Sequence, residues 1–194
     1  MEGNIVTLKE LLIEDPLLLD RTIVSCVSET PLHVSSMLGH LGFVQGLLSQ
    51  KPELASELDS HGSSALHLAS AKGYLEIVKE LLLVDPEVCM VRNQDGRTPL
   101  HVATVKGRVK VVSELLQVKA ESTRVLTDRV ETVLHLCVGH NRLEVLKVLV
   151  EAIGKDDELV NWKDYDGNTI LHIAVSKKQN EVCLISMLNL LTIN

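Results

Sequence analysis

The sequence of 194 residues predicts an all-α solenoid, in which similar helical units stack and each unit contacts only its neighbours. Two observations lead to this fold class. A four-residue signature recurs at steps of 34, 34, 34 and 37 residues, and glycines recur at matching places between the copies. The signature begins at Thr30, Ser64, Thr98, Thr132 and Thr169 and ends at His33, His67, His101, His135 and His172.

The elements of one unit can be taken in order from residues 93–126. Asp95-Gly96 predicts a tight turn, because glycine accepts a positive φ angle without a side-chain penalty. Thr98 then caps a short helix over residues 99–106, whose first position is a proline and which ends at the next glycine. A second helix follows over about residues 108–118, where apolar residues recur at helical spacing.

The other copies repeat this order of elements. The turn glycines are Gly62, Gly96 and Gly167, and the glycines between helices are Gly39, Gly73 and Gly107. A proline stops the second helix at Asp15-Pro16, Lys51-Pro52 and Asp85-Pro86. One helix pair cannot bury its apolar face alone, so the units must stack. We therefore predict a single domain over residues 1–194, with a partial repeat at 1–24 and repeats at 25–58, 59–92, 93–126, 127–163 and 164–194.

Composition excludes several other classes of protein. The chain is 45% hydrophobic but has only four aromatic residues, so the core must consist of Leu, Val, Ile and Ala. A net charge of −7 argues against nucleic acid as a partner. Four dispersed cysteines without a Cys-x-x-Cys pair indicate a reducing compartment, hence the cytoplasm. The longest apolar run, residues 182–193, is interrupted by polar residues and falls short of the roughly 20 residues of a membrane span.

The signature resembles that of ankyrin repeats, whose Thr-Pro-Leu-His-x-Ala motif is intact from Thr98 to Ala103. Stretches such as KPELASELDSHGSSALHLASAKG and VRNQDGRTPLHVATVKGRVKVVSEL are also similar to plant ankyrin proteins of the bian-da and accelerated-cell-death kind. That likeness implies immune or stress signalling, and those proteins usually carry a membrane-spanning PGG block, which this sequence lacks. Residues 3–12 align with a second helix whose mate is missing, so we expect fraying or self-association at this end.

The five signature histidines do not predict a metal site. Stacked repeats advance by about 10 Å, the thickness of a helix layer, so successive imidazoles cannot share one ion at roughly 2 Å. We expect each imidazole to bond its own capping residue and a backbone group of the adjoining turn. The sequence also has no phosphate-binding loop, nucleophile elbow or His-Glu-x-x-His motif. It therefore predicts no metal, no cofactor and no enzymatic activity.

The candidate partner-binding surface is the concave groove between the turns and the short helices. Leu38, Lys72, Lys106, His140 and Lys177 end successive short helices, and Asp59, Asp95, Asp128 and Asp166 are expected at the turn tips. Trp162 and Tyr165 follow the longer last interval, where they either anchor a partner or cover the loop by local packing. The candidate groove residues are Lys72, Asp95, Arg97, Lys106, Asp128, Arg129, His140, Trp162, Tyr165, Asp166 and Lys177.

These observations favour a cytoplasmic, non-enzymatic protein–protein interaction module, in plant immune or stress signalling as the resemblance implies. One alternative is the cytoplasmic portion of a membrane-anchored ankyrin sensor or channel-like protein, placed at the cytoplasmic face of a membrane. Another is a direct protein inhibitor of a signalling enzyme such as a kinase. A third is the product of a truncated reading frame without a function.

Overall fold

The computed structural model describes residues 29–154 and 158–180. Within these ranges the chain forms nine α-helices and four 3-10 helices. No β-strand occurs there, and the one bridge of β type joins Leu58 to Ser64. The all-α repeat fold predicted from the sequence is confirmed.

The first four described repeats each consist of a short helix, a longer helix and a 3-10 turn, and the short helix of the fifth is described. The first two repeats contain α3 (Pro31–Leu38), α4 (Leu41–Gln50), η1 (Pro52–Ser56), α5 (Ala65–Lys72), α6 (Leu75–Val84) and η2 (Pro86–Met90). The next contain α7 (Pro99–Lys106), α8 (Val109–Val118), η3 (Ala120–Arg124), α9 (Val133–Gly139), α10 (Leu143–Ile153), η4 (Glu158–Asn161) and α11 (Ile170–Ser176). The helices expected at residues 99–106 and about 108–118 are confirmed to within one residue.

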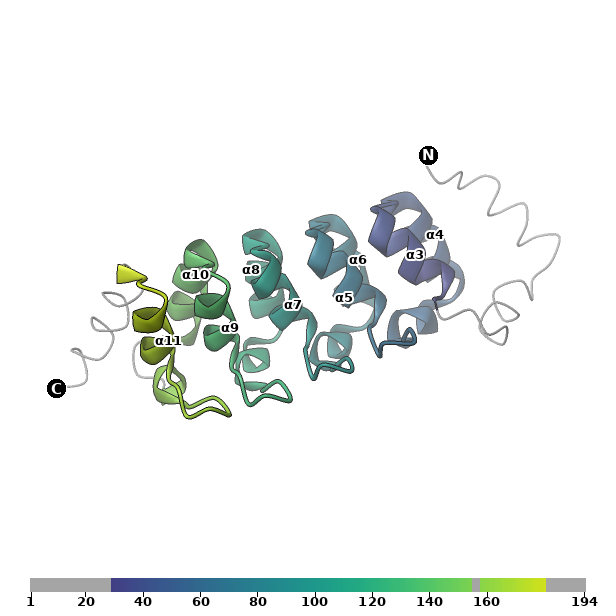
Figure 1. Cartoon of the computed structure of the whole chain (residues 1–194). Coiled ribbons are helices and arrows are strands. Elements are labelled where there is room, and N and C mark those ends of the chain that lie inside the picture. Colours follow the sequence, from purple (N-terminus) through teal and green to yellow (C-terminus); the bar gives the residue numbers. More distant parts are fainter. Residues whose placement is uncertain (1–28, 155–157, 181–194) are drawn as a thin grey trace.

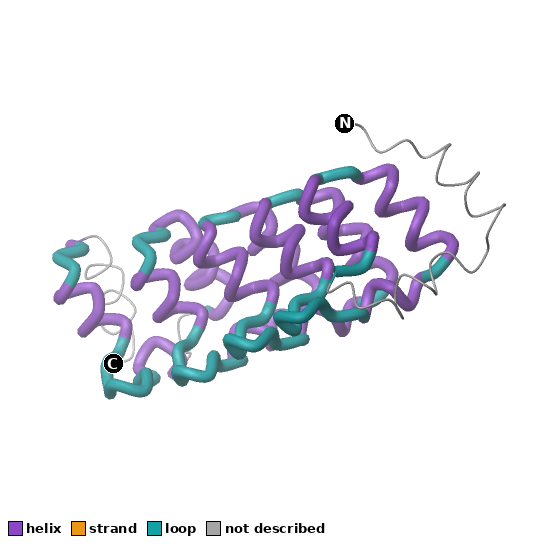
Figure 2. The backbone as a smooth tube through the Cα atoms, turned by 45° about the vertical axis from the view of Figure 1, so that its right-hand side comes forward, coloured by secondary structure: helices purple, strands orange, loops and turns teal. Residues whose placement is uncertain are grey.

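The repeats lie in a row in chain order, and the loops that open them project along one edge of the row (Figure 1). Helix α5 packs against α3 and α7, and helix α6 packs against α4 and α8. The short helices therefore form one layer and the longer helices a second layer (Figure 2). This arrangement places equivalent residues of successive repeats side by side.

Local chemistry fixes both ends of the short helices. Each begins with a reciprocal capping box between the signature Thr or Ser and the histidine three residues later, as at Thr98 and His101. The first three end at glycines in the left-handed conformation, for example Gly73 with φ of 87°. The equivalent positions of the fourth and fifth repeats hold Asn141 and Lys178, with φ of 55° and 56°.

Proline ends the longer helices of the first two described repeats, as predicted. Helix α4 stops at Gln50 before Pro52, and α6 stops before Pro86. Each proline then opens a 3-10 turn that buries two apolar side chains, such as Val88 and Cys89 in η2. These turns were not part of the sequence prediction. The predicted stop at Asp15-Pro16 lies outside the described residues.

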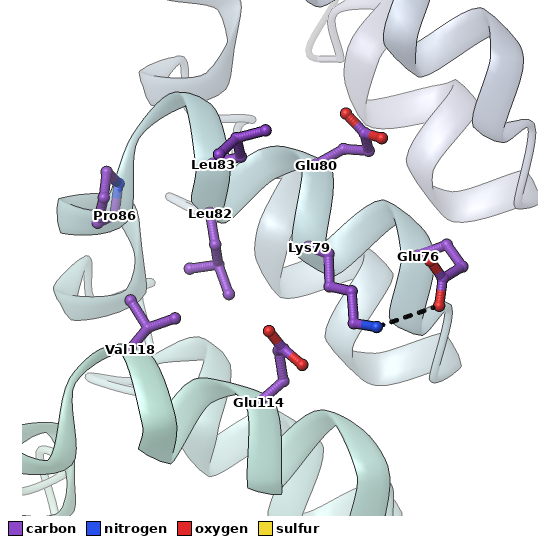
Figure 3. A pocket seen from close by; sticks show the side chains of 8 residues that line it. All are labelled: Glu76, Lys79, Glu80, Leu82, Leu83, Pro86, Glu114 and Val118. Carbon is purple, nitrogen blue, oxygen red and sulfur yellow. Dashed lines mark hydrogen bonds and ion pairs between the residues drawn. The ribbon is translucent and has the colours of Figure 1, made fainter.

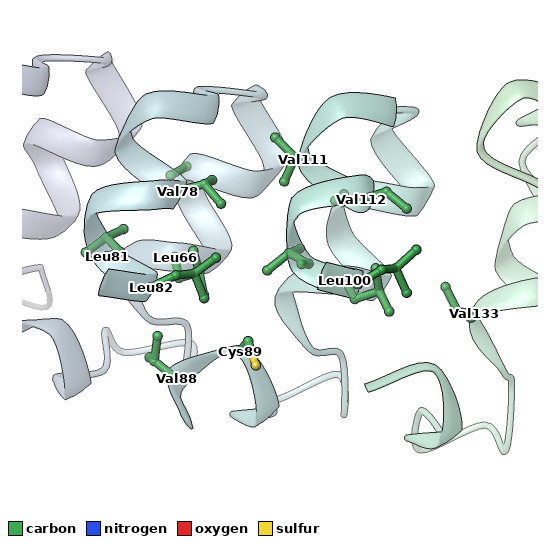
Figure 4. Packing of buried hydrophobic residues seen from close by; sticks show 14 of the residues in the cluster. Leu66, Val78, Leu81, Leu82, Val88, Cys89, Leu100, Val111, Val112 and Val133 are labelled. Atoms are coloured by element: carbon green, nitrogen blue, oxygen red, sulfur yellow. The ribbon is translucent and has the colours of Figure 1, made fainter. Parts of the chain in front are cut away.

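The core is aliphatic, as the composition predicts. Leu66, Leu100 and Val133 come from successive short helices and are fully buried. Side chains of the longer helices, among them Val78 and Val112, pack into the same cluster (Figure 4). The stability of the stack therefore resides in contacts that run from one repeat to the next.

The turn of the fourth repeat carries a strained residue. Val130 has φ of 59° at the position where other repeats have Gly62, Gly96 and Gly167, with φ of 69°, 70° and 80°. A left-handed conformation costs about 1–2 kcal/mol for a residue with a Cβ atom, and β-branched residues are especially disfavoured there.

Replacing Val130 with Gly should therefore raise the free energy of unfolding, by up to about 1 kcal/mol once the roughly 0.5–1 kcal/mol of glycine entropy is subtracted. The gain is smaller than the strain itself, because Val130 is 38% exposed and its loss also removes some buried apolar surface. Urea denaturation measures the effect, and the reverse change Gly62→Val is the control, expected to destabilise. If the Val130→Gly protein were less stable than the wild type, the left-handed conformation of Val130 would not be a source of strain.

Candidate functional site

The turns that open the repeats are fingers with one shared geometry. In the finger of residues 93–97, the Asn93 N–H donates to the Arg97 carbonyl and the Gly96 N–H to the Asn93 carbonyl, both at 2.9 Å. The Asn93 side-chain oxygen accepts from the N–H groups of Asp95 and Arg97 at 3.0 and 2.9 Å. Asp59, Thr127 and Asp164 occupy the same place in the other fingers.

This geometry fixes which residues form the finger tips. The second and third residues of each finger are exposed, and they are Ser60-His61, Gln94-Asp95, Asp128-Arg129 and Tyr165-Asp166. Asp95, Asp128 and Asp166 lie at the tips, as expected, and the candidates Arg129 and Tyr165 lie there too. Asp59 is a correction: it lies at the base of its finger, where its Oδ1 accepts from His61 and Ser63 N–H groups at 2.8 Å. The predicted acidic row therefore does not extend to the second repeat.

Neighbouring fingers are joined by hydrogen bonds, with one exception. The Gln94 N–H donates to the His61 carbonyl at 2.9 Å, and the Tyr165 N–H to the Arg129 carbonyl at 3.1 Å. No such backbone bond joins the third and fourth fingers in the described part of the chain. Their link is an ion pair, in which Arg92 Nη2 lies 2.6 Å from Asp128 Oδ1. Asp128 is thus both a candidate groove residue and a structural one.

The signature histidines tie each repeat to the next finger. The Ser64 N–H donates to His67 Nδ1 at 3.1 Å, which leaves the proton on Nε2, and Nε2 donates to the Arg97 carbonyl at 2.9 Å. His33 and His135 make the equivalent bonds to Ser63 and Asn168 carbonyls, at 2.9 and 3.0 Å. The expected histidine arrangement is confirmed at these three positions.

The third repeat differs, because His101 keeps the bond to its cap but Nε2 has no hydrogen-bond partner among the described residues. Burial lowers the pKa of His101 to about 4, and the positive charge of Arg97 acts in the same direction. The nearby backbone of Val125, which makes no hydrogen bond of good geometry to the ring, favours the charged form but does not offset burial. At the last repeat, His172 bonds its cap Thr169 at 2.8 Å and is exposed.

The predicted basic ridge lies on the exposed ends of the short helices. Lys72, Lys106, His140 and Lys177 are all exposed there. Desolvation lowers the pKa of His140, as do the positive charges of Lys177, Arg97 and Arg142, so this imidazole is protonated less readily than a free one. Lys177 already has one hydrogen-bond partner in the protein, because its Nζ donates to the Gly139 carbonyl. Arg97 is half-buried and pairs with Asp95 at 3.5 Å.

A cross-repeat cap behind this ridge was missed by the sequence analysis. Arg108 Nε donates to the Ala71 carbonyl at 3.1 Å, and Arg142 Nε to the Val105 carbonyl at 2.9 Å. Gln179, at the equivalent place, donates to the Val138 carbonyl at 3.1 Å. Each side chain satisfies the last carbonyls of the short helix of the preceding repeat. The signal in the sequence is a long polar residue directly after the inter-helix position of the third, fourth and fifth repeats.

The two aromatic candidates lie in different environments. Trp162 is half-buried and packs against the hydrophobic core. Tyr165 is 80% exposed at a finger tip. The packing of Trp162 favours the interpretation that it covers the longer loop, whereas Tyr165 is accessible to a partner.

Three further features of the described residues bear on the site. Among residues 29–154 and 158–180, no group of three or more His, Cys, Asp or Glu could hold a metal ion. No helix in those ranges has the length and apolar character to cross a membrane. Burial raises the pKa of the Cys137 thiol to about 12 and also raises that of Cys89, so neither is a ready nucleophile. The proposed self-association at residues 3–12 lies outside the described residues.

Comparison of the sequence with known protein families shows which family the chain belongs to. The model of ankyrin repeats (3 copies) matches residues 1–90, 61–125, 80–158 and 120–188. No curated protein matches the chain. These overlapping segments span nearly the whole sequence and agree with the capping boxes, fingers and stacked helix pairs of the structure. The chain belongs to the ankyrin-repeat family.

Proposed function

We propose that this protein binds a protein partner with the surface formed by its finger tips and by the exposed ends of its short helices. The ankyrin repeats indicate a protein–protein interaction module. One observation carries the choice of surface. The finger backbone is held constant by the same hydrogen bonds in each repeat, while the exposed tip residues differ in size and charge.

The charges of this surface suggest how a partner is recognised. Lys72, Lys106 and Lys177 supply the positive charge of the basic ridge, and Asp95 and Asp166 lie on the finger tips. A partner that places acidic groups on the ridge and basic groups at the tips would be complementary to it. Exposed charges act mainly by steering association and by excluding partners of the wrong charge.

We further propose that the protein is non-enzymatic and works in the cytoplasm, in plant immune or stress signalling. Support for the setting comes from the similarity of its repeats to the bian-da and accelerated-cell-death kind of ankyrin protein. Support for the compartment comes from Cys89 and Cys137, which are free, buried thiols.

The test of this surface is a double charge reversal, Lys72→Glu with Lys106→Glu. Both side chains are exposed, so folding should be almost unaffected. Association with a partner captured from plant tissue should slow by at least about tenfold, and more strongly at low salt. Surface plasmon resonance at two salt concentrations measures the rates.

Lys106→Glu and Lys110→Glu provide a matched pair of single variants. Lys106 ends the short helix α7, whereas the exposed Lys110 lies on the longer helix α8 of the same repeat. Only Lys106→Glu should slow association. An equal loss in both variants, or unchanged rates in the double reversal, would place the interface elsewhere.

A further inference from the structure

A cleft lies on the layer of longer helices, between α6 and α8 (Figure 3). Its volume is about 480 Å³, within the range of about 300–1,000 Å³ typical of binding sites. The lining residues are Glu76, Lys79, Glu80, Leu82, Leu83, Pro86, Glu114 and Val118. We propose that this cleft docks a basic amphipathic segment of a partner protein, with an apolar side chain on the leucines and valine and Lys or Arg beside the glutamates.

The apolar part of the cleft is accessible. Leu83 is 81% exposed and Val118 is 39% exposed. Leu82, only 4% exposed, forms the floor, and its side chain points across the gap toward Val118. An apolar side chain of a partner that covers these groups would remove their surface from water, which favours binding by about 25 cal/mol per Å².

The polar part of the cleft is acidic. It contains Glu76, Glu80 and Glu114 but one cation, Lys79, which gives a net charge of −2 for the lining (three negative, one positive). Lys79 pairs with Glu76 at 3.5 Å within its own helix. In the described part of the chain Glu114 makes no ion pair, so its carboxylate is available to a basic group.

The side-chain bond that crosses the junction between α4 and α6 has no counterpart across the cleft among the described residues. Between α4 and α6, Gln45 Nε2 reaches across and donates to Glu80 at 2.6 Å. The residue equivalent to Gln45 in the next repeat is Lys79, which turns toward Glu76 instead of crossing to Glu114. One repeat further on, the equivalent Ser113 bonds the Val109 carbonyl of its own helix at 3.1 Å.

Charge also decides between possible occupants. A second copy docked symmetrically would bring the same glutamates against each other, and juxtaposed like charges disfavour such a contact. The negative headgroups of a membrane surface would be repelled in the same way. A positively charged protein segment is the occupant that suits both parts of the cleft.

The experiment uses a fluorescein-labelled synthetic helix of Leu and Lys with one apolar face, and the same helix with Glu in place of Lys. Fluorescence anisotropy at low salt measures binding to the whole chain. The Leu/Lys peptide should bind and the Leu/Glu peptide should not. Leu83→Ser and Glu114→Lys should each weaken binding by about tenfold, the change that 1.4 kcal/mol of interaction produces.

Two matched variants separate this site from others. Glu151→Lys makes the same charge change as Glu114→Lys at an exposed position of α10, and Lys106→Glu alters only the finger-side surface; both should keep the Leu/Lys affinity within about twofold. Equal weakening by Glu114→Lys and Glu151→Lys, no effect of Leu83→Ser, or no binding of the Leu/Lys peptide would overturn the proposal. Dimers that dissociate on Leu83→Ser would overturn it in favour of a second copy.

Discussion

Lowering the pH from 6.5 to 4 is expected to remove roughly 6 kcal/mol of stability through two buried histidines. Burial lowers the pKa of His67 and of His101 from 6.5 to about 4. Over this range the unfolded chain binds a proton at each ring and the folded chain does not, so acid favours unfolding. The difference corresponds to roughly 3 kcal/mol per histidine. Above pH 6.5 the contribution of both is complete.

The groups around the two imidazole rings account for the lowered pKa values. Around His67, burial outweighs the Arg97 carbonyl and the negative charge of Asp59, which favour the charged ring. Around His101, Arg97 and Arg92 add positive charge to the effect of burial. Protonation would also convert Nδ1 from an acceptor into a donor facing the N–H of the capping residue.

Urea denaturation at several pH values between 4 and 7 measures this loss. His67→Gln is the informative variant, because Gln can take the same place in a capping box but does not titrate. Its stability should fall less steeply with decreasing pH than that of the wild type, by about one proton. The same slope in both proteins would show that His67 does not titrate in this way.

Replacing Leu100 with Ala is expected to lower the free energy of unfolding by about 2–5 kcal/mol. The Leu100 side chain is fully buried in α7, a helix that packs against both α5 and α9 (Figure 4). A cavity at this place weakens the contacts of the third repeat with both neighbours, and stability in a stacked protein depends on those contacts.

Urea denaturation at neutral pH measures the change, and Leu83→Ala on α6 is the control. Leu83 is 81% exposed, so the same truncation there should change stability by no more than about 0.5 kcal/mol. A Leu100→Ala protein as stable as the Leu83→Ala protein would mean that the central stack does not carry the stability.

The parts of the fold that could be predicted are those determined by residues adjacent in the sequence. Thr98, Pro99 and Gly107 define a helix through capping and φ preferences, and the structure has that helix at the expected place. Val130 and Lys178 adopt left-handed conformations without being Gly or Asn, so their sequence gives no turn signal. Their φ angles match those of the Gly or Asn residues at the equivalent positions of other repeats, a likeness that only comparison between repeats brings out.

Parts of the candidate surfaces that depend on contacts between repeats could not be predicted. The Arg92–Asp128 pair spans 36 residues, and its formation depends on how the third and fourth fingers meet. The cleft between α6 and α8 depends on whether Lys79 pairs within its helix or across the junction. Periodicity places such residues on the correct layer but does not select among their partners.

The unpartnered Nε2 of His101 has a mechanical consequence. Two hydrogen bonds that join other neighbouring repeats are missing between the third and fourth repeats in the described part of the chain. They are the bond from the signature histidine to the next finger and the backbone bond between the two fingers. The third and fourth repeats remain joined by the packing of α7 on α9 and of α8 on α10, by the Arg92–Asp128 pair and by the bond from Arg142 to the Val105 carbonyl. We therefore expect bending of the row to concentrate between the third and fourth repeats, with Lys106 on one side and His140 on the other.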